Sequence, residues 1–389
     1  MSSHVKKIKV LHVVDLLKTG GVEVMFMQYI SAVISLNPNV EHSVFALRIT
    51  EQRKDDLSAL GVKLYYPVNN KYHLFRRIKI RNLIAREKFD IVHGQNSSGN
   101  LWGAIGVVFQ KTKLIAHEHG GAWGARGLHV LLSRIWASMA SIIICNSLAA
   151  ETIIRKKIYD KDKFKVIYNG VKIEAETTEK KTNGEHFKIL FVGRLEEVKG
   201  IKELLEALKQ LKQNNIQFQC NILGDGSRRE WMSNYVERNG LNEFVSFKGL
   251  VSSVGDYMSS SDVLVLPSLR EPLGNVIIEA ANFKLPVIAS NVDGIRELVQ
   301  NNVSGILLNP THPRFLKGLP KHVVGEFGKL VTPMAIDSND LVQALMFLKE
   351  SPDVRRSFGA AAHALLSGFT IQAYARSISE TYTQMSAKK

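Results

Sequence analysis

The chain has 389 residues, of which 45% are hydrophobic and 22% are charged, and it carries a formal net charge of +15. This length suits two domains of ordinary size, and the composition excludes a disordered or collagen-like chain. The excess of Lys and Arg favours an anionic partner, which can be nucleic acid, an anionic membrane or a phosphate-bearing substrate.

The first residues, MSSHVKKIKVLHVVDLL, predict a buried strand rather than a signal peptide, because the apolar run is short and lacks a small-residue cleavage site. No stretch reaches the roughly 18 to 20 apolar residues that a spanning helix needs. Cys145 and Cys220 lie inside strand-length apolar runs. This predicts buried free thiols and a reducing, cytoplasmic compartment.

Short β-branched runs alternate with helix-period segments such as GIKELLEALKQLKQ (200–213). The runs of the first half are 8–14, 42–47, 90–94, 113–117, 141–147 and 165–170, and those of the second half are 187–193, 218–224, 245–249, 262–268, 286–290 and 304–309. Continuous apolar strands between helices predict parallel sheets covered on both faces. The expected fold class is therefore α/β, with two Rossmann-like domains.

The polar residues 171–186 lack apolar periodicity and predict a linker between an N-terminal domain (1–170) and a C-terminal domain (187–369). A second irregular stretch, 309–333, is rich in Pro and Gly and predicts an insertion. The segment 370–389 predicts an amphipathic helix, capped by Thr370, that packs back onto the N-terminal domain.

Unusual residues follow several predicted strands, where open parallel sheets bind ligands. Gly20 and Gly21 open a helix and suit a phosphate, although a tight turn is the alternative. Arg194 and Lys199 can clamp a diphosphate, although solvated surface charges would show the same pattern. Gly224 lies in a third glycine-rich strand end, ILGDGSRRE.

The segment SLREPLGNVIIEA (268–280) predicts a loop that enters a helix. The backbone N–H groups of Leu273, Gly274 and Asn275 then lie at a helix N-terminus, which suits a phosphate. Glu271 precedes the helix and Glu279 lies about one turn inside it, so the two carboxylates need not face each other.

Six motifs in this order resemble the retaining glycosyltransferases of the GT-B fold, family 4. They are VIYNGV (166–171), FVGRLEEVKG (191–200), LGDGSRRE (223–230), EPLGNVIIEA (271–280), LPVIASNVDGIRELV (285–299) and SGILLNP (304–310). In the first half the resemblance depends on TGGVE (19–23), AHEHG (116–120) and ICNS (144–147). The chain departs from the family's pair of glycines at Asp293-Gly294 and in the insertion at 309–333, which leaves the sugar and acceptor preference open.

The resemblance assigns roles residue by residue. Arg194 and Lys199 would hold the donor diphosphate, Glu279 the nucleotide ribose and Glu271 the donor sugar. Gly274 with its neighbours, and Gly21, would cradle the phosphates. His117 would be the active-site histidine, with His119 as a competitor for that role.

The resemblance further implies a metal-independent enzyme without a cofactor that transfers a sugar with retention from a nucleotide-diphosphate sugar, with a UDP-sugar favoured. The acceptor would be a glycan or a lipid-linked molecule in cell-surface polysaccharide or lipopolysaccharide synthesis. Basic groups and helix N-termini would stabilise the charge on the leaving diphosphate.

His117 and His119 have two other interpretations, a metal pair on one strand face or core histidines. We expect no metal, because no third ligand cluster accompanies them. The segment DKD (160–162) resembles a metal-binding acidic triplet but lies in a Lys-rich turn, and we expect it to be solvated.

The segment 71–88 predicts a basic amphipathic helix with Leu74, Ile78, Leu83 and Ile84 among seven Lys and Arg residues. Such a helix can lie on the anionic inner face of the cytoplasmic membrane, or it can pack on the protein by its apolar stripe. Two other classes remain: a GT-B nucleotide-sugar epimerase, and a nucleic-acid-binding protein. The second would interleave aromatic and basic residues, a pattern that is missing, so we expect no nucleic acid partner.

Overall fold

The computed structural model describes residues 7–17, 21–67, 73–173, 186–314 and 319–387, without the side chains of 73–78 and 122. It divides into two compact units, residues 1–172 with 368–389, and residues 173–367. The expected linker at 171–186 lies mostly outside the described residues.

The first unit is built on a seven-stranded parallel sheet with the order β3-β2-β1-β4-β5-β6-β7. Its strands are β1 (Ile8–Leu16), β2 (Val40–Ile49), β3 (Lys63–Tyr65), β4 (Ile91–Gln95), β5 (Lys113–Glu118), β6 (Ile142–Cys145) and β7 (Phe164–Val166). Its helices are α1 (Gly21–Leu36), α2 (Glu51–Ala59), α3 (His73–Glu87), α4 (Asn96–Val107), η1 (Gly121–Gly124), α5 (Leu128–Met139), α6 (Leu148–Lys157) and α14 (Ile371–Ala387). The apolar runs form strands because both faces of the sheet are covered and both must be apolar.

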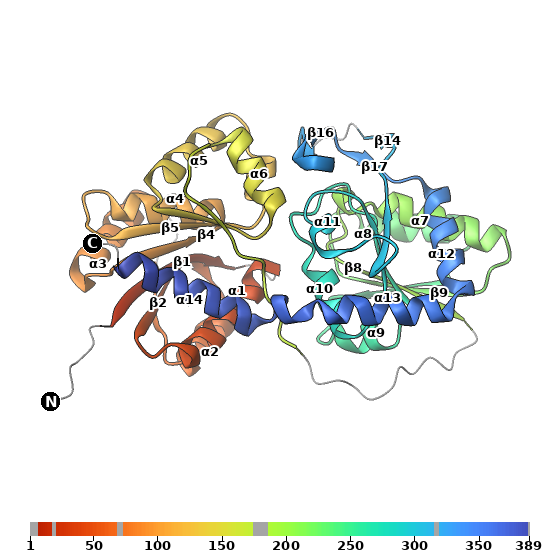
Figure 1. The fold of residues 1–389 in the computed structure, drawn as a ribbon, viewed down its shortest axis with the longest axis horizontal. Helices are drawn as coiled ribbons and strands as arrows, with labels where there is room; N and C mark the ends of the chain where they lie inside the picture. The colour runs from red at the N-terminus through yellow and green to blue at the C-terminus, as the bar shows by residue number, and fades with distance from the viewer. Residues whose placement is uncertain (1–6, 18–20, 68–72, 174–185, 315–318, 388–389) are drawn as a thin grey trace. The chain divides into compact units, whose positions relative to one another are not determined.

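The last helix, α14, packs along α1 (Figure 1). Its buried residues Ile371, Tyr374, Ile378, Tyr382 and Met385 recur every three or four positions, so they form one stripe. This stripe joins β1 and α1 in one hydrophobic core. Thr370 caps the helix, because its Oγ1 accepts a hydrogen bond from the N–H of Ala373 at 3.0 Å.

Helix α3 packs against α4 by its apolar stripe. Ile80, Leu83 and Ile84 are buried, and Ile80 and Ile84 lie against Gly106 of α4, where an added Cβ would meet Ile84 Cδ1 at 2.6 Å. Of the two interpretations of this helix, packing on the protein by its apolar stripe holds for Leu83 and Ile84, because protein covers them. The side chains of Leu74 and Ile78 lie outside the described residues.

The second unit is built on a six-stranded parallel sheet with the order β10-β9-β8-β11-β12-β13. Its strands are β8 (Phe187–Val192), β9 (Phe218–Leu223), β10 (Val245–Gly249), β11 (Val263–Leu266), β12 (Val287–Ser290) and β13 (Gly305–Leu308). Its helices are η2 (Glu197–Lys199), α7 (Ile201–Gln213), α8 (Arg229–Arg238), α9 (Gly255–Ser259), α10 (Asn275–Asn282), α11 (Ile295–Leu298), α12 (Ser338–Glu350) and α13 (Pro352–Ala364). Two parallel-sheet units confirm the predicted fold class.

The predicted insertion contains short antiparallel ladders. Strand β14 (His312–Pro313) pairs with β17 (Met334–Ala335), and β15 (Val323–Val324) pairs with β16 (Leu330–Val331). The short helix η3 (Glu326–Gly328) joins β15 to β16. We call residues 309–314 and 319–335 the insert.

The two cysteines and the lengths of the helices can be compared with the predictions from the sequence. Cys145 and Cys220 are buried free thiols, as predicted. Among the described helices, none combines the length and the apolar character that crossing a bilayer would require.

Candidate functional site

The exit loop of β11, residues 267–274, carries Glu271. This carboxylate is buried and forms an ion pair with Nζ of Lys199, and it accepts a second, longer hydrogen bond from Ser268 Oγ at 3.4 Å. Lys199 belongs to η2, which follows β8, so two strand ends contribute to one charged pair. Lys199 is thus the cation next to Glu271.

Backbone contacts hold the exit loop against η2. The N–H of Leu269 donates to the carbonyl of Val198 at 2.9 Å. Gly200 ends η2 with φ +69°, and a Cβ there would lie 1.8 Å from the carbonyl oxygen of Pro267. Only glycine allows this approach, which sets the position of Lys199 beside the loop.

Arg194 and Gly224 lie at the ends of the neighbouring strands β8 and β9. Arg194 is exposed, in contrast to Lys199. Gly224 has φ +124°, and a Cβ there would lie 2.0 Å from the carbonyl oxygen of Gly193. The structure therefore places Gly224 as a close-packing residue next to the loop that carries Arg194.

Helix α10 begins at Asn275 and is preceded by Gly274, whose φ is +97°. Leu273 is buried in the core, so its side chain anchors the loop. Glu279 lies within α10 and is half-buried. Glu271 and Glu279 thus lie on different elements, and the carboxylate of Glu271 faces Lys199.

In the first unit, His117 and His119 follow one another on the same face at the end of β5, with ring centres 4.0 Å apart. His117 is completely buried, and its Nδ1 lies 3.3 Å from Nε2 of His93. His119 is 7% exposed and its Nε2 lies 2.9 Å from Oε1 of Gln95. Residue His119 thus retains a small exposure that His117 lacks.

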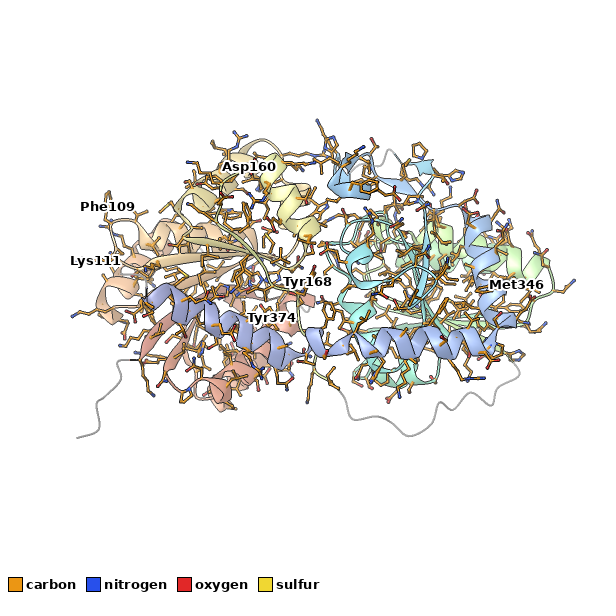
Figure 2. The ribbon with its side chains drawn as sticks, in the orientation of Figure 1. Phe109, Lys111, Asp160, Tyr168, Met346 and Tyr374 are labelled. Carbon is orange, nitrogen blue, oxygen red and sulfur yellow. The ribbon has the colours of Figure 1, made fainter. Side chains whose placement is uncertain are left out.

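These two rings continue a histidine row, which we define as His42, His12, His93, His117 and His119. The helices α1 and α14 cover it with tyrosines: the hydroxyl of Tyr382 lies 2.6 Å from Nδ1 of His93 and 3.0 Å from the hydroxyl of Tyr29. Tyr374, labelled in Figure 2, packs its ring 6.2 Å from that of His117.

Burial lowers the pKa of every histidine in the row, because a charged imidazole loses its hydration there. The pKa of His42 falls to about 4, and those of His93 and His119 fall to about 3. At neutral pH the row is thus uncharged, and the rings of His117 and His119 are neutral.

The loop after β5 is tightly bonded. Glu118 is buried and its Oε1 accepts hydrogen bonds from the N–H groups of Gly120, at 2.8 Å, and of Gly121. Asn100 of α4 bonds both backbone groups of His117, at 3.0 and 3.1 Å. The backbone of His117, and of the two glycines after His119, is therefore held by side-chain hydrogen bonds.

Gly21 is the first residue of α1 and is exposed, whereas Gly20 lies outside the described residues. Across the residues that are described, no three His, Cys, Asp or Glu side chains come together as metal ligands would. Asp160, in the acidic turn, is exposed and pairs with Arg155 at 3.1 Å.

Sequence reasoning missed Gln95, Asn100 and the three histidines on β1, β2 and β4. A signal for them exists, since His12, His42 and His93 interrupt apolar strand runs. Buried polar side chains need partners, so such interruptions indicate a shared network.

Comparison with known proteins gives the family. Residues 172–319 match the family described as glycosyl transferases group 1, and residues 19–175 match glycosyltransferase family 4. An uncharacterized glycosyltransferase of Methanocaldococcus jannaschii is 34% identical over 272 residues, which are 63% of this chain and 69% of that protein.

Two further relatives carry more specific names. The UDP-Gal:alpha-D-GlcNAc-diphosphoundecaprenol alpha-1,3-galactosyltransferase of Escherichia coli is 28% identical over 337 residues, 79% of this chain and 86% of its own. The crystal structure of Anabaena Alr3699/HepE in complex with UDP and glucose superposes with a TM-score of 0.80 at 21% identity, covering 97% of this chain and 100% of that one.

The two parallel-sheet units and these matches define a glycosyltransferase of the GT-B fold. The chain belongs to the group 1, family 4 glycosyltransferases.

Proposed function

We propose that the protein is a retaining glycosyltransferase that moves a sugar from a nucleotide-diphosphate sugar, with UDP the favoured nucleotide, to a glycan or lipid-linked acceptor. The observation that carries this proposal is the pair of Lys199 and Glu271 at the ends of β8 and β11. Negative charge develops on the diphosphate as the bond from the sugar C1 to the phosphate oxygen breaks. Lys199, Arg194 and the N-terminus of α10 would stabilise that charge, and Glu279 would bind the ribose.

Retention is best explained by attack on the same face as the departing diphosphate. Glu271 is engaged with Lys199, and an ion-paired carboxylate is a poor candidate for a nucleophile that forms a glycosyl-enzyme. In our proposal Glu271 instead orients the sugar, and His119 or His117 supplies a neutral hydrogen-bonding ring to the substrate.

The names of relatives favour UDP. The Escherichia coli relative is named for a UDP-galactose donor, and the Anabaena structure contains UDP and glucose. A panel of nucleotide sugars in a thermal-shift assay tests this, because a ligand that binds the folded state raises its unfolding temperature. We expect UDP and a UDP-sugar to raise it more than GDP, ADP or CMP compounds do, and no shift with any of them would contradict the proposal.

The same donors test the reaction. We expect the chain to release UDP from a UDP-sugar at a rate that rises with acceptor, and the sugar linkage formed to keep the anomeric configuration, as nuclear magnetic resonance of the product would show. A new nucleotide sugar formed from the donor alone would indicate an epimerase instead.

We further propose that transfer needs no divalent metal, since the basic side chains and the helix N-terminus can neutralise the diphosphate. Turnover should therefore survive EDTA. Loss of turnover with EDTA that Mn²⁺ or Mg²⁺ restores would contradict this part of the proposal.

A lipid-linked acceptor would bring the enzyme to an anionic membrane, and α5 offers a surface for it. Leu128, Leu131 and Ile135 are spaced by three and four residues and are 67%, 56% and 43% exposed. Arg126 and Arg134 are exposed in the same segment, and residues 119–150 contain no Asp or Glu. Exposed apolar side chains with only positive neighbours in the sequence suit an anionic lipid surface.

Co-sedimentation with vesicles tests this surface. We expect binding to phosphatidylglycerol-containing vesicles and little binding to pure phosphatidylcholine. Leu131→Glu with Ile135→Glu should abolish binding, whereas Phe347→Glu, at a 48% exposed position of α12, should leave it unchanged. Equal binding by both variants would exclude α5 as the lipid-binding surface.

A further inference from the structure

Asp293 lies between β12 and α11 in a backbone conformation that favours glycine. Its φ is +46°, and its side chain is almost completely buried at 2% exposure. A non-glycine residue in this region carries a conformational cost that glycine does not. At Asp293 the side chain makes two hydrogen bonds that offset this cost.

The contacts of Asp293 join two separate segments. Its Oδ2 accepts from the N–H of Glu271 at 3.0 Å, and its Oδ1 accepts from the N–H of Val324 at 2.6 Å. Its own N–H donates to the carbonyl of Val324 at 2.9 Å, and the next N–H, of Gly294, donates to the carbonyl of Glu271 at 3.1 Å. The backbone of Glu271 is thus held on both sides, at its N–H by the Asp293 side chain and at its carbonyl by the N–H of Gly294, and the same side chain also binds the insert at Val324.

The insert makes a second contact with the same region. Leu319 and Ala335 of the insert form a small hydrophobic cluster with Leu269 of the exit loop, and Val198 of η2 packs against it. Arg314 of the insert forms an ion pair with the buried Glu203 of α7. The insert is therefore attached to both segments that carry the pair of Lys199 and Glu271.

We propose that Asp293 is a positioning residue for sugar transfer. Because its carboxylate bonds the amides of both Glu271 and Val324, it fixes the exit loop to the insert. This inference rests on the proposed function of the Lys199–Glu271 pair. A carboxylate has two acceptor oxygens, one for each of these N–H groups, and has no N–H of its own. An Asn side chain offers only one acceptor oxygen, and Gly offers none. The acid is therefore needed for its two acceptors.

Asp293→Asn and Asp293→Gly test the proposal against Asn302→Gly. Asn302 has φ +59° and is exposed, so its replacement makes the same backbone change without removing such a bridge. We expect both Asp293 variants to lower kcat by about tenfold or more, since small misplacements of reacting groups have large effects. The Kd for UDP should change less than about threefold, because Lys199, Arg194 and Glu279 remain, and Asn302→Gly should match the wild type.

Hydrogen exchange of the full chain without donor provides a readout that is independent of turnover. Peptides covering 268–275 should exchange faster in Asp293→Gly, because the N–H of Glu271 loses its acceptor, and in Asp293→Asn, because one amide oxygen cannot accept from both N–H groups as the carboxylate does. Leu319→Ala, which leaves Asp293 in place, should raise exchange in the same peptides and lower kcat in the same direction.

The outcomes separate the two proposals. If the wild type binds no nucleotide and turns over no donor, the proposed function is wrong. The role of Asp293 in sugar transfer is then wrong as well. If the wild type is active and the Asp293 variants keep its kcat, the positioning role of Asp293 is overturned, whether or not hydrogen exchange at 268–275 rises. Folded variants with wild-type exchange at 268–275 overturn it as well, even where kcat falls.

Discussion

Lys199 and Arg194 occur in one motif, but their surroundings differ. Lys199 is largely buried and paired with Glu271, whereas Arg194 is exposed. Two cations of this kind would act on the same diphosphate but would contribute differently to stability.

We predict that Lys199→Ala and Arg194→Ala each lower donor turnover by about 10²-fold, from about 3 kcal/mol of lost charge stabilisation. Only Lys199→Ala should also lower the unfolding temperature, since it leaves the buried Glu271 without its cation. Steady-state kinetics and thermal unfolding measure both effects, with the exposed Lys248→Ala as control. Near-normal turnover in both variants would contradict the diphosphate assignment.

The two glutamates should have separable roles, because Glu271 lies in the exit loop and Glu279 lies within α10. We predict that Glu279→Gln weakens UDP binding by roughly 1.5 to 3 kcal/mol, the contribution of a charged hydrogen bond to the ribose. Glu271→Gln should leave UDP affinity nearly unchanged and lower turnover. Calorimetry with UDP and kinetics with the UDP-sugar distinguish them, and wild-type behaviour of both would reduce the glutamates to residues of the helix entry.

At the scale of elements, α14 completes the first unit from the far end of the chain. Its stripe of Tyr374, Ile378 and Tyr382 covers the histidine row, and the hydroxyl of Tyr382 reaches both His93 and Tyr29. Burial of these polar groups is tolerated because each of these hydroxyl contacts pairs a donor with an acceptor.

We predict that Tyr382→Phe lowers the free energy of unfolding by about 1 to 3 kcal/mol. The substitution removes one hydrogen bond from the buried hydroxyl of Tyr29 and one from the buried Nδ1 of His93. Urea unfolding measures this change. The control is Tyr66→Phe, at a 40% exposed tyrosine of the same unit, which should stay within about 0.5 kcal/mol of the wild type. Equal stability of the two variants would show that the network contributes little.

At the scale of the whole molecule, the net charge affects which partners bind, whereas the buried histidines affect how stability depends on pH. The net charge of +15 belongs to the whole chain and favours anionic partners. The histidine row is neutral and makes stability depend on pH. In the unfolded chain these imidazoles bind protons below about pH 6.5, whereas in the folded chain they resist protonation.

The unfolded state therefore binds more protons between about pH 6.5 and the lowered pKa values, and stability rises with pH in that window. We predict that the unfolding free energy falls as pH drops from 7.5 to 5, by up to about 1.4 kcal/mol per pH unit for each histidine that stays neutral. Urea unfolding across this range measures the slope. His42→Gln should reduce the slope, and the exposed His129→Gln should not; a flat profile in the wild type would contradict the prediction.

Much of the fold could be predicted because it depends on local patterns. Apolar β-branched runs formed the strands of both sheets, and the periodic segment 200–213 formed α7 (Ile201–Gln213). Strand β3 (Lys63–Tyr65) was missed because three residues at a sheet edge carry too little periodicity. The ladders of the insert were missed for the same reason.

The residues of the candidate site were predictable as a set, and their contacts were not. Glycines and charges after strands indicate a phosphate site from sequence, because the carboxyl ends of parallel strands share one edge. That Lys199 faces Glu271 depends on a backbone approach between Gly200 and Pro267, which are 67 positions apart. A pattern of single positions carries no information on such a distance.

Residue types and short spacings were enough to predict the strand and helix alternation, the parallel sheets, the charged motifs at strand ends and the family that these motifs resemble. Contacts between distant segments were needed to establish that Leu83 and Ile84 of α3 pack on α4, that α5 exposes its own apolar stripe, and that Asp293 joins the exit loop to the insert. These outcomes depend on which segments pack together, and packing between distant segments is settled by shape, burial and hydrogen bonding over the whole unit rather than by local preference.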